Sequence, residues 1–205
     1  RLNPEARITV LESGPDVSFA TCGLPYHIGG EIRSRSRLIL QSPESFHEQY
    51  NVLVYTNIEA LQIDRDERLV TARHTATGEI SEHPYDALIL AQGGRPIVPS
   101  IPGADREGVH TLWTLSDMDA IQAYLREHAP RSAVVVGGGF IGLEMAEALA
   151  LRGLSVTVVE KAGQVMPALE PEIAGAVQTE LEARSVALHT GVAVSEIGQS
   201  TVTTD

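Results

Sequence analysis

In the central part of the chain, two short apolar runs flank a glycine-rich turn and a stretch with helical spacing of apolar residues. The run 133–136 is too short for a helix and rich in valine, which predicts a buried parallel strand. A glycine-rich turn follows at 137–142. Apolar residues then recur at helical spacing over 143–152, and Gly153 ends the predicted helix. A further apolar run at 155–159 predicts a second strand, so the order is strand, turn, helix, strand.

The turn has the pattern Gly137-x-Gly139-x-x-Gly142, and Glu160 ends the second strand 23 positions after Gly137. In this pattern Gly137 makes the tight turn, Gly139 lets the backbone approach a pyrophosphate, and Gly142 lets helix and strand pack closely. Amides at the start of the helix would hold the phosphates. Glu160 would accept a hydrogen bond from a ribose 2′-hydroxyl and repel a 2′-phosphate, which favours NAD over NADP. The unit predicts a dinucleotide site; the alternative is a tight turn without a ligand.

A second copy of the strand-and-acid pattern lies near the start of the chain. Residues 7–11 predict a strand that ends at Glu12, and 8–12 matches 156–160 almost residue for residue. If the two strands are equivalent, a matching glycine-rich turn would fall before residue 1. We therefore expect an α/β fold with two Rossmann-like, three-layer dinucleotide-binding domains, both incomplete in this chain. The alternative is a chance similarity between two short β-rich segments.

Turn signals and periodicity predict the remaining elements. Residues 86–91 predict a buried strand that ends at Gln92 and Gly93, and a helix is expected over 116–127 with Ser116 as its cap. Other helices are predicted at 43–50 and 172–183, and strands at 52–54, 58–63, 69–74, 79–82, 186–189 and 192–197.

Composition narrows the possible function classes. The chain of 205 residues is 43% apolar and 20% charged, as is common in globular proteins, and its net charge is −12. Basic residues are scattered apart from Arg33, Arg35 and Arg37, which argues against nucleic acid as a partner. No apolar run has membrane-spanning length and no signal peptide is recognisable, so we expect no membrane partner and a cytoplasmic protein. The histidines have no metal-ligand spacing, so no metal site is predicted.

The single cysteine, Cys22, cannot form a disulfide within the chain. Gly23 and Pro25 follow it and predict a helix N-terminus, where the helix dipole would stabilise a thiolate. From these residues alone, a buried structural cysteine and a reactive thiol both remain open.

The run Ser18-Phe-x-x-Cys22-Gly-Leu-Pro25-Tyr26 resembles the active-site signature of the single-cysteine branch of the pyridine nucleotide-disulfide oxidoreductases. Within that branch, its Gly-Leu-Pro-Tyr sequence is most similar to coenzyme A disulfide reductases and coenzyme A persulfide or polysulfide reductases. Water-forming NADH oxidases and NADH peroxidases are near relatives with other residues after Cys-Gly. The segments around Ala91 and at 164–167 also resemble this family.

The resemblance implies FAD and NAD(P)H as cofactors and assigns roles to individual residues. Cys22 would be the redox-active nucleophile over the flavin, and Ser18 would lie near the coenzyme A substrate. Thr21 stands at the substrate position where the family usually has Asn. Further residues that would bind the cofactors are Glu12 and Gly93 for FAD, and Phe140 and Glu144 toward the nicotinamide and flavin. For Phe140 the alternative is a packing role, and for Glu144 an ordinary exposed position on the helix.

The resemblance also implies a domain organisation and an activity. Residues 1–100 would be a partial FAD-binding domain without its first strand and glycine-rich loop, and 101–205 an NAD(H)-binding domain without its C-terminal part. Electrons would pass from NADH through flavin to Cys22, which would reduce a small thiol or disulfide substrate such as coenzyme A disulfide, persulfide or polysulfide. The alternatives are an NADH oxidase or peroxidase, or an inactive nucleotide-binding fragment. The parent protein would be a homodimer.

Overall fold

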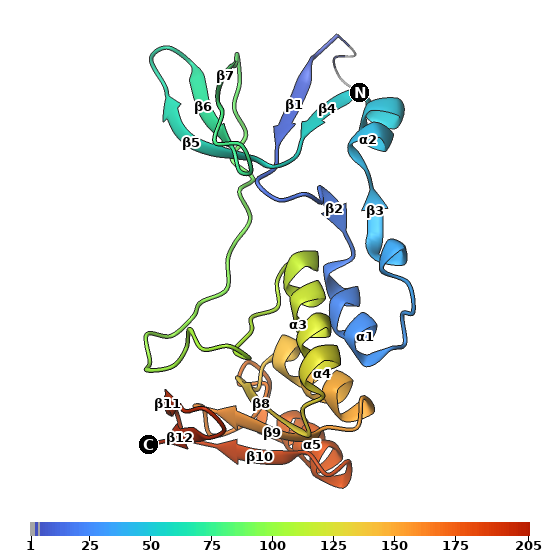
Figure 1. The fold of residues 1–205 in the computed structure, drawn as a ribbon, viewed down its shortest axis with the longest axis vertical. Helices are drawn as coiled ribbons and strands as arrows, with labels where there is room; N and C mark the ends of the chain where they lie inside the picture. Colours follow the sequence, from blue (N-terminus) through green and yellow to red (C-terminus); the bar gives the residue numbers. More distant parts are fainter. Residues whose placement is uncertain (1–2, 4) are drawn as a thin grey trace. The chain divides into compact units, whose positions relative to one another are not determined.

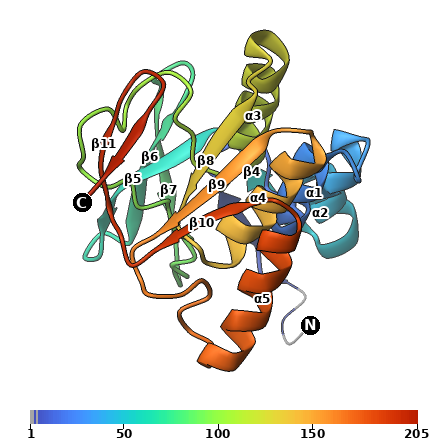
Figure 2. The same cartoon turned by 90° about the horizontal axis from the view of Figure 1, so that it is seen from below.

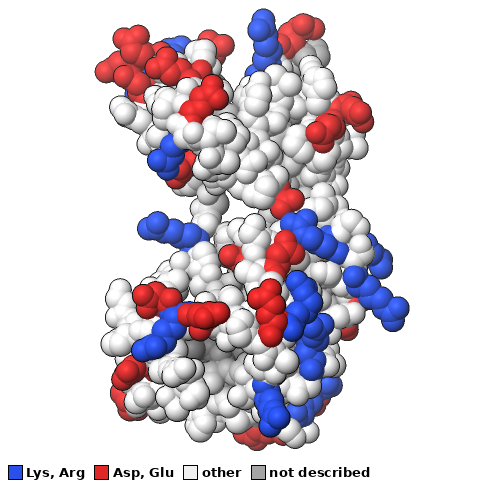
Figure 3. All heavy atoms as spheres, in the orientation of Figure 1, with Lys and Arg blue, Asp and Glu red and all other residues white. Residues whose placement is uncertain are grey.

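The computed structural model describes residues 3 and 5–205, which form two compact units (Figure 1). The first unit contains residues up to Ala20 together with Ser36–Gly94, and the second contains Thr21–Arg35 together with Arg95–Asp205. The segment that carries Cys22 therefore belongs to the same unit as the glycine-rich turn. The domain boundary near residue 100 stays a prediction. On the face that Figure 3 shows, acidic and basic side chains occur on both units.

The second unit is built on a parallel sheet with strand order β10-β9-β8. Helix α4 connects β8 to β9, and helix α5 connects β9 to β10; Figure 2 shows the three strands side by side. The bounds are β8 Ser132–Val136, α4 Phe140–Leu151, β9 Ser155–Glu160, α5 Pro171–Ala183 and β10 Ala187–Thr190. Central strand β9 buries three valines, at positions 156, 158 and 159. This arrangement is half of a doubly wound sheet, and it confirms the predicted α/β fold class.

Strand β8 differs from its prediction as a fully buried strand. Val134 and Val136 are 42% and 53% exposed, whereas Ala133 and Val135 are half-buried. β8 lies at the edge of the sheet and packs against α4 on one face, so its side chains alternate between covered and uncovered positions. Helix α4 also begins three residues before the predicted start, because Gly139 serves as its N-cap.

The first unit combines one parallel strand pair with antiparallel hairpins. Strand β1 pairs in parallel with β4, and helix α2 precedes β4 along the chain. Strands β2 and β3 pair antiparallel, and β5, β6 and β7 form a three-stranded antiparallel sheet. The bounds are β1 Ile8–Leu11, β2 Ser18–Phe19, β3 Ile39–Gln41, α2 Pro43–Tyr50, β4 Val52–Tyr55, β5 Ile58–Asp64, β6 Leu69–His74 and β7 Ile80–Pro84.

Strands β1 and β9 share local pairing and loop geometry, which supports the predicted equivalence of the two strands. Thr9 lies opposite Leu53, and Thr157 lies opposite Ala187. Each threonine lies three residues before an acid, Glu12 directly after β1 and Glu160 as the last residue of β9. The loops beyond the strands repeat the same backbone hydrogen bonds. The amides of Ile58 and Asn57 donate to the carbonyls of Glu12 and Gly14 (both 2.9 Å), and those of Val192 and Gly191 donate to Glu160 and Ala162 (3.3 and 2.8 Å).

The predicted buried strand at 86–91 is wrong. This segment forms no strand, and its apolar side chains are exposed, with Ile89 at 86% and Leu90 at 68%. A strand requires a neighbour that satisfies its backbone amides and carbonyls, and no described residue pairs with this segment. An apolar run alone therefore does not produce a strand here.

The second unit also contains helices α1 (Leu24–Gly29) and α3 (Leu115–His128) and a hairpin of β11 (Val194–Ile197) and β12 (Val202–Thr204). Strand β12 was not predicted. Helix α3 buries Leu115, Met118 and Ile121. Its cap is Thr114 rather than the predicted Ser116. The Thr114 hydroxyl accepts from the Asp117 amide (3.2 Å), and the Asp117 carboxylate accepts from the Thr114 amide (2.8 Å).

Replacing Thr114 with alanine is expected to lower the free energy of unfolding by about 1 kcal/mol, because the amides of the first helical turn lose their partner. The matched variant Ser116→Ala removes an exposed hydroxyl and should change stability by less than about 0.5 kcal/mol. Urea denaturation followed by circular dichroism measures both. Equal losses from the two variants would contradict the assignment of Thr114 as the cap.

No helix in the described part of the chain is long and apolar enough to cross a membrane.

Candidate functional site

The glycine-rich turn between β8 and α4 requires glycine for different reasons at different positions. Gly137 has φ +109°, a left-handed conformation that other residues adopt at a cost. A Cβ added to Gly142 would collide with the carbonyl oxygen of Gly137, so α4 can cross the turn closely only with glycine there. A Cβ on Gly139 would meet nothing within 4 Å, which leaves this side of the turn open. The predicted approach of a pyrophosphate at Gly139 stays a prediction.

The N-terminus of α4 points out of this turn. Gly139 is the N-cap and makes no side-chain cap, so the first helical amides have no capping side chain. Phe140, the first helical residue, is 64% exposed and therefore does not serve as a core packing residue. A helix N-terminus of this kind favours negative charge, as on a phosphate.

Glu160 binds the backbone of the turn, a contact that the sequence reasoning missed. Its Oε2 accepts a hydrogen bond from the Gly138 amide and its Oε1 from the Ala162 amide, both at 2.6 Å. Glu12 repeats the local part of this contact, because its Oε1 accepts from the Gly14 amide at 2.6 Å. No signal in the sequence indicated the contact with Gly138. The predicted contact of Glu160 with a ribose stays a prediction.

Cys22 lies in a 3₁₀ turn, Thr21–Gly23, directly before helix α1, and both Cys22 and Thr21 are exposed. The structure therefore excludes the alternative of a buried structural cysteine. The helix that follows is short, but it is firmly anchored because Leu24 and Ile28 are almost completely buried. Pro25 stands in its first turn, as predicted.

Helix α1 packs against α4, which brings the cysteine segment next to the helix of the glycine-rich turn. A Cβ on Gly29 would lie 3.3 Å from the Cα of Ala148, so the two helices approach closely at this point. On its other side, α1 contacts α3, where the Gln122 side chain donates to the His27 carbonyl (3.0 Å). Two segments more than a hundred residues apart in sequence are thus held together within one unit.

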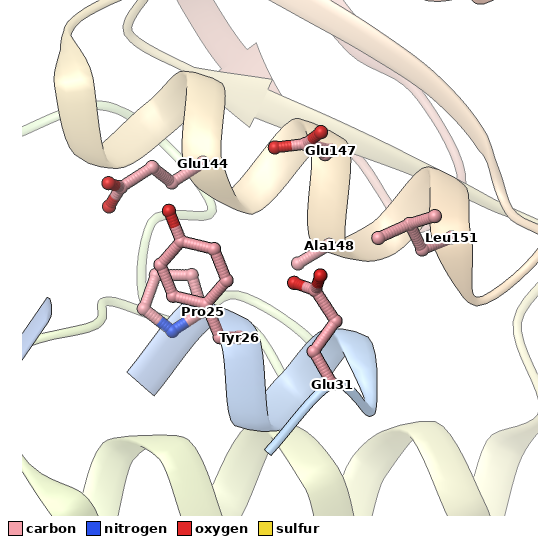
Figure 4. Close-up of a pocket in the computed structure, with 7 residues that line it drawn as sticks. All are labelled: Pro25, Tyr26, Glu31, Glu144, Glu147, Ala148 and Leu151. Atoms are coloured by element: carbon pink, nitrogen blue, oxygen red, sulfur yellow. The ribbon is translucent and has the colours of Figure 1, made fainter. Parts of the chain in front are cut away.

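A shallow pocket lies between α1 and α4 (Figure 4). Its walls are Pro25, Tyr26, Glu31, Glu144, Glu147, Ala148 and Leu151. The Tyr26 hydroxyl points toward α4 on the side of Glu144. Glu144 is half-buried, so it is not the ordinary exposed helix residue of the alternative interpretation. Its predicted position toward nicotinamide and flavin stays a prediction.

The other predicted site residues belong to the first unit. Glu12 follows β1, Ser18 is half-buried in β2, and Gly93 has φ +66° with open space around its Cα. The positive φ at Gly93 supports the predicted glycine turn, although the strand before it is absent. Their roles toward FAD and substrate stay predictions.

A parallel β-α-β unit with a glycine-rich turn and an acid at the end of the second strand defines a Rossmann-type dinucleotide-binding protein. The model of the pyridine nucleotide-disulphide oxidoreductase family matches residues 1–205, and the chain belongs to this family. This membership confirms the family resemblance of the cysteine segment and supports FAD and NAD(P)H as cofactors.

Individual relatives are enzymes of this family. An NADH oxidase of Methanocaldococcus jannaschii is 35% identical over 187 residues, and a coenzyme A disulfide reductase of Staphylococcus haemolyticus is 34% identical over 186 residues. Each match covers 91% of this chain and 42% of the relative. The crystal structure of reduced Bacillus anthracis CoADR-RHD has a TM-score of 0.96 and 40% identity, over 100% of this chain and 37% of that one. The chain thus spans less than half the length of these relatives.

Proposed function

We propose that this chain belongs to an FAD- and NADH-dependent oxidoreductase in which Cys22 reduces coenzyme A disulfide or a related persulfide or polysulfide. The observation that carries the proposal is the position of Cys22. It is the only cysteine of the chain, it is exposed, and its turn is anchored beside the helix that begins at the glycine-rich turn. The relatives named as coenzyme A disulfide reductases support this choice of substrate.

The residues of the second unit fit a nicotinamide dinucleotide. The open side of Gly139 admits a pyrophosphate, the first amides of α4 can donate to it, and Glu160 lies at the end of β9 where an adenosine ribose would be expected. When bound, the nicotinamide and the flavin supply a pair of electrons. In the first unit, Glu12 and Gly93 are the residues that we assign to FAD, because Glu12 repeats the local geometry of Glu160.

Cys22 would act as a nucleophile toward the sulfur–sulfur bond of the substrate. The Cys22 thiolate attacks one sulfur of coenzyme A disulfide, a mixed disulfide forms, and one coenzyme A thiolate leaves and takes up a proton. Two electrons and a proton then cleave the mixed disulfide, which releases the second coenzyme A and restores the Cys22 thiolate. One protein cysteine is sufficient because the substrate provides the second sulfur. Thr21 and Ser18, the predicted substrate residues, would bind the coenzyme A portion.

An NADH oxidase is the second candidate, favoured by the similarity to the enzyme of that name from M. jannaschii. In that reaction a peroxide oxygen would take the place of the substrate sulfur, and Cys22 would pass through a sulfenic acid. The two candidates differ in the oxidant that accelerates NADH consumption, which is coenzyme A disulfide in one and oxygen or peroxide in the other.

Incubation of the protein with coenzyme A disulfide tests the proposal without any requirement for bound flavin. Intact-mass analysis should show the addition of one coenzyme A less two hydrogens, and dithiothreitol should remove this adduct. Because Cys22 is the only cysteine, the adduct can form at no other thiol. Rapid formation at neutral pH, compared with free cysteine at the same concentration, supports the proposal. A rate no greater than that of free cysteine would contradict it.

A further inference from the structure

The backbone of Gly138, at the centre of the glycine-rich turn, makes a hydrogen bond through both its amide and its carbonyl. Its amide donates to Glu160 Oε2 (2.6 Å), and its carbonyl accepts from the Met166 amide (2.7 Å). Gly138 is buried, and a Cβ there would lie 3.1 Å from the side chain of Val165, which is itself completely buried. The segment that follows β9, residues 161–167, therefore packs against the turn, and we call it the back wall of the turn.

The back wall includes the segment 164–167, which resembles the family and had no assigned role. Met166 has φ +49°, a left-handed conformation that is uncommon for a residue other than glycine, and this conformation aims its amide at the Gly138 carbonyl. On its C-terminal side, the segment is tied to the following residues, because the Gln164 side-chain amide donates to the Leu169 carbonyl (2.9 Å). On its N-terminal side, the Glu160 carboxylate accepts a hydrogen bond from the Ala162 amide (2.6 Å).

We propose that Glu160 is a positioning residue for the glycine-rich turn, in addition to its predicted contact with a ribose. Both carboxylate oxygens accept a short hydrogen bond from a backbone amide, and such charge-assisted bonds are about twice as strong as neutral ones. The carboxylate thereby connects the turn before α4 with the loop after β9. This inference rests on the proposed binding of a nicotinamide dinucleotide at the turn.

A positioning role for Glu160 changes the expected effect of its removal on the affinities for NADH and NADPH. If Glu160 acted only by repelling a 2′-phosphate, an uncharged variant would bind NADPH more tightly and NADH more weakly. If Glu160 also holds the turn, its loss disorders the amides that both coenzymes need for their common pyrophosphate. An uncharged variant should then bind both NADH and NADPH more weakly.

The variants Glu160→Ala and Glu160→Gln separate the two roles. Alanine removes both acceptors, whereas glutamine keeps one carbonyl oxygen and replaces the other acceptor with an amide that can only donate. The matched control is Glu182→Gln, which removes the same charge from an exposed position on α5. Titration calorimetry gives the Kd of NADH and NADPH for each protein. Hydrogen exchange of the Gly138 amide, measured by NMR without nucleotide, gives the state of the turn.

For Glu160→Ala we expect the Kd to rise about tenfold for NADH and several-fold for NADPH, and the Gly138 amide to exchange at least about tenfold faster. Glu160→Gln should lie between Glu160→Ala and the unchanged protein, and Glu182→Gln should match the unchanged protein. Tighter NADPH binding with unchanged Gly138 exchange would overturn the inference. If the unchanged protein bound neither coenzyme, the proposed function would fail, whereas the exchange of Gly138 would still decide whether Glu160 positions the turn.

Discussion

Replacing Cys22 with serine is expected to lower the rate of coenzyme A disulfide reduction by on the order of a thousandfold or more. A serine hydroxyl is almost entirely protonated at neutral pH and is a much weaker nucleophile toward sulfur than a thiolate. Because Cys22 is exposed and makes no disulfide, the substitution should leave the fold unchanged. The measurement is NADH consumption, at 340 nm, by the FAD-loaded protein with coenzyme A disulfide.

NADH affinity provides the control for this variant. The glycine-rich turn lies between β8 and α4 and not in the cysteine segment, so Cys22→Ser should bind NADH with an affinity within about twofold of the unchanged protein. A Cys22→Ser protein that kept most of its turnover would show that the sulfur–sulfur bond is reduced without a protein thiol. That outcome would remove the central assignment of the proposed mechanism.

Local patterns predicted those parts of the fold that depend on nearby residues. The β-α-β unit was predictable because the valine run, the three glycines and the helical spacing of apolar residues all indicate the same structure. Helix α2 was predicted with its observed bounds, since Pro43 at its start and the Ser42 cap are both local signals. The cap of α3 could also have been found, because Thr114 precedes Asp117 by the three positions of a capping box.

Features that depend on distant partners could not be predicted in this way. The segment 86–91 has the composition of a strand, yet Ile89 and Leu90 are exposed because no described strand pairs with it. The exposure of Val134 and Val136 likewise depends on what covers the second face of β8.

The same distinction applies to the candidate site. The glycine pattern predicted the turn at Gly137 and the close approach at Gly142, because a short motif encodes both features. The cysteine run singled out Cys22, whose redox role stays a prediction. The packing of α1 against α4 was not predictable, since it depends on the close approach of Gly29 and Ala148 across the sequence. The contact between Glu160 and Gly138 was missed because the motif associates the acid with a ribose, and the spacing of 22 residues says nothing about a backbone partner.

Gly142→Ala is expected to have the largest effect on stability. In the first turn of α4, a Cβ at this position would collide with the carbonyl oxygen of Gly137 and would lie 3.4 Å from a methyl group of Val135. Because the main obstacle is backbone in a turn with φ +109°, it cannot move away as a flexible side chain would. We expect the free energy of unfolding to fall by about 2–3 kcal/mol, the upper part of the range for overpacked sites, and NADH binding to weaken with it.

Helix α5 offers a matched control for this substitution. A Cβ on Gly175 meets nothing within 4 Å, so Gly175→Ala should stabilise the protein by about 0.5–1 kcal/mol through helix propensity alone. Urea denaturation of both variants therefore separates the cost of the close contact from the ordinary gain of glycine to alanine. Since Gly142 is also helical, its substitution would be stabilising if the turn could relax. A stabilised Gly142→Ala protein with unchanged NADH affinity would show that α4 does not need to approach the turn this closely.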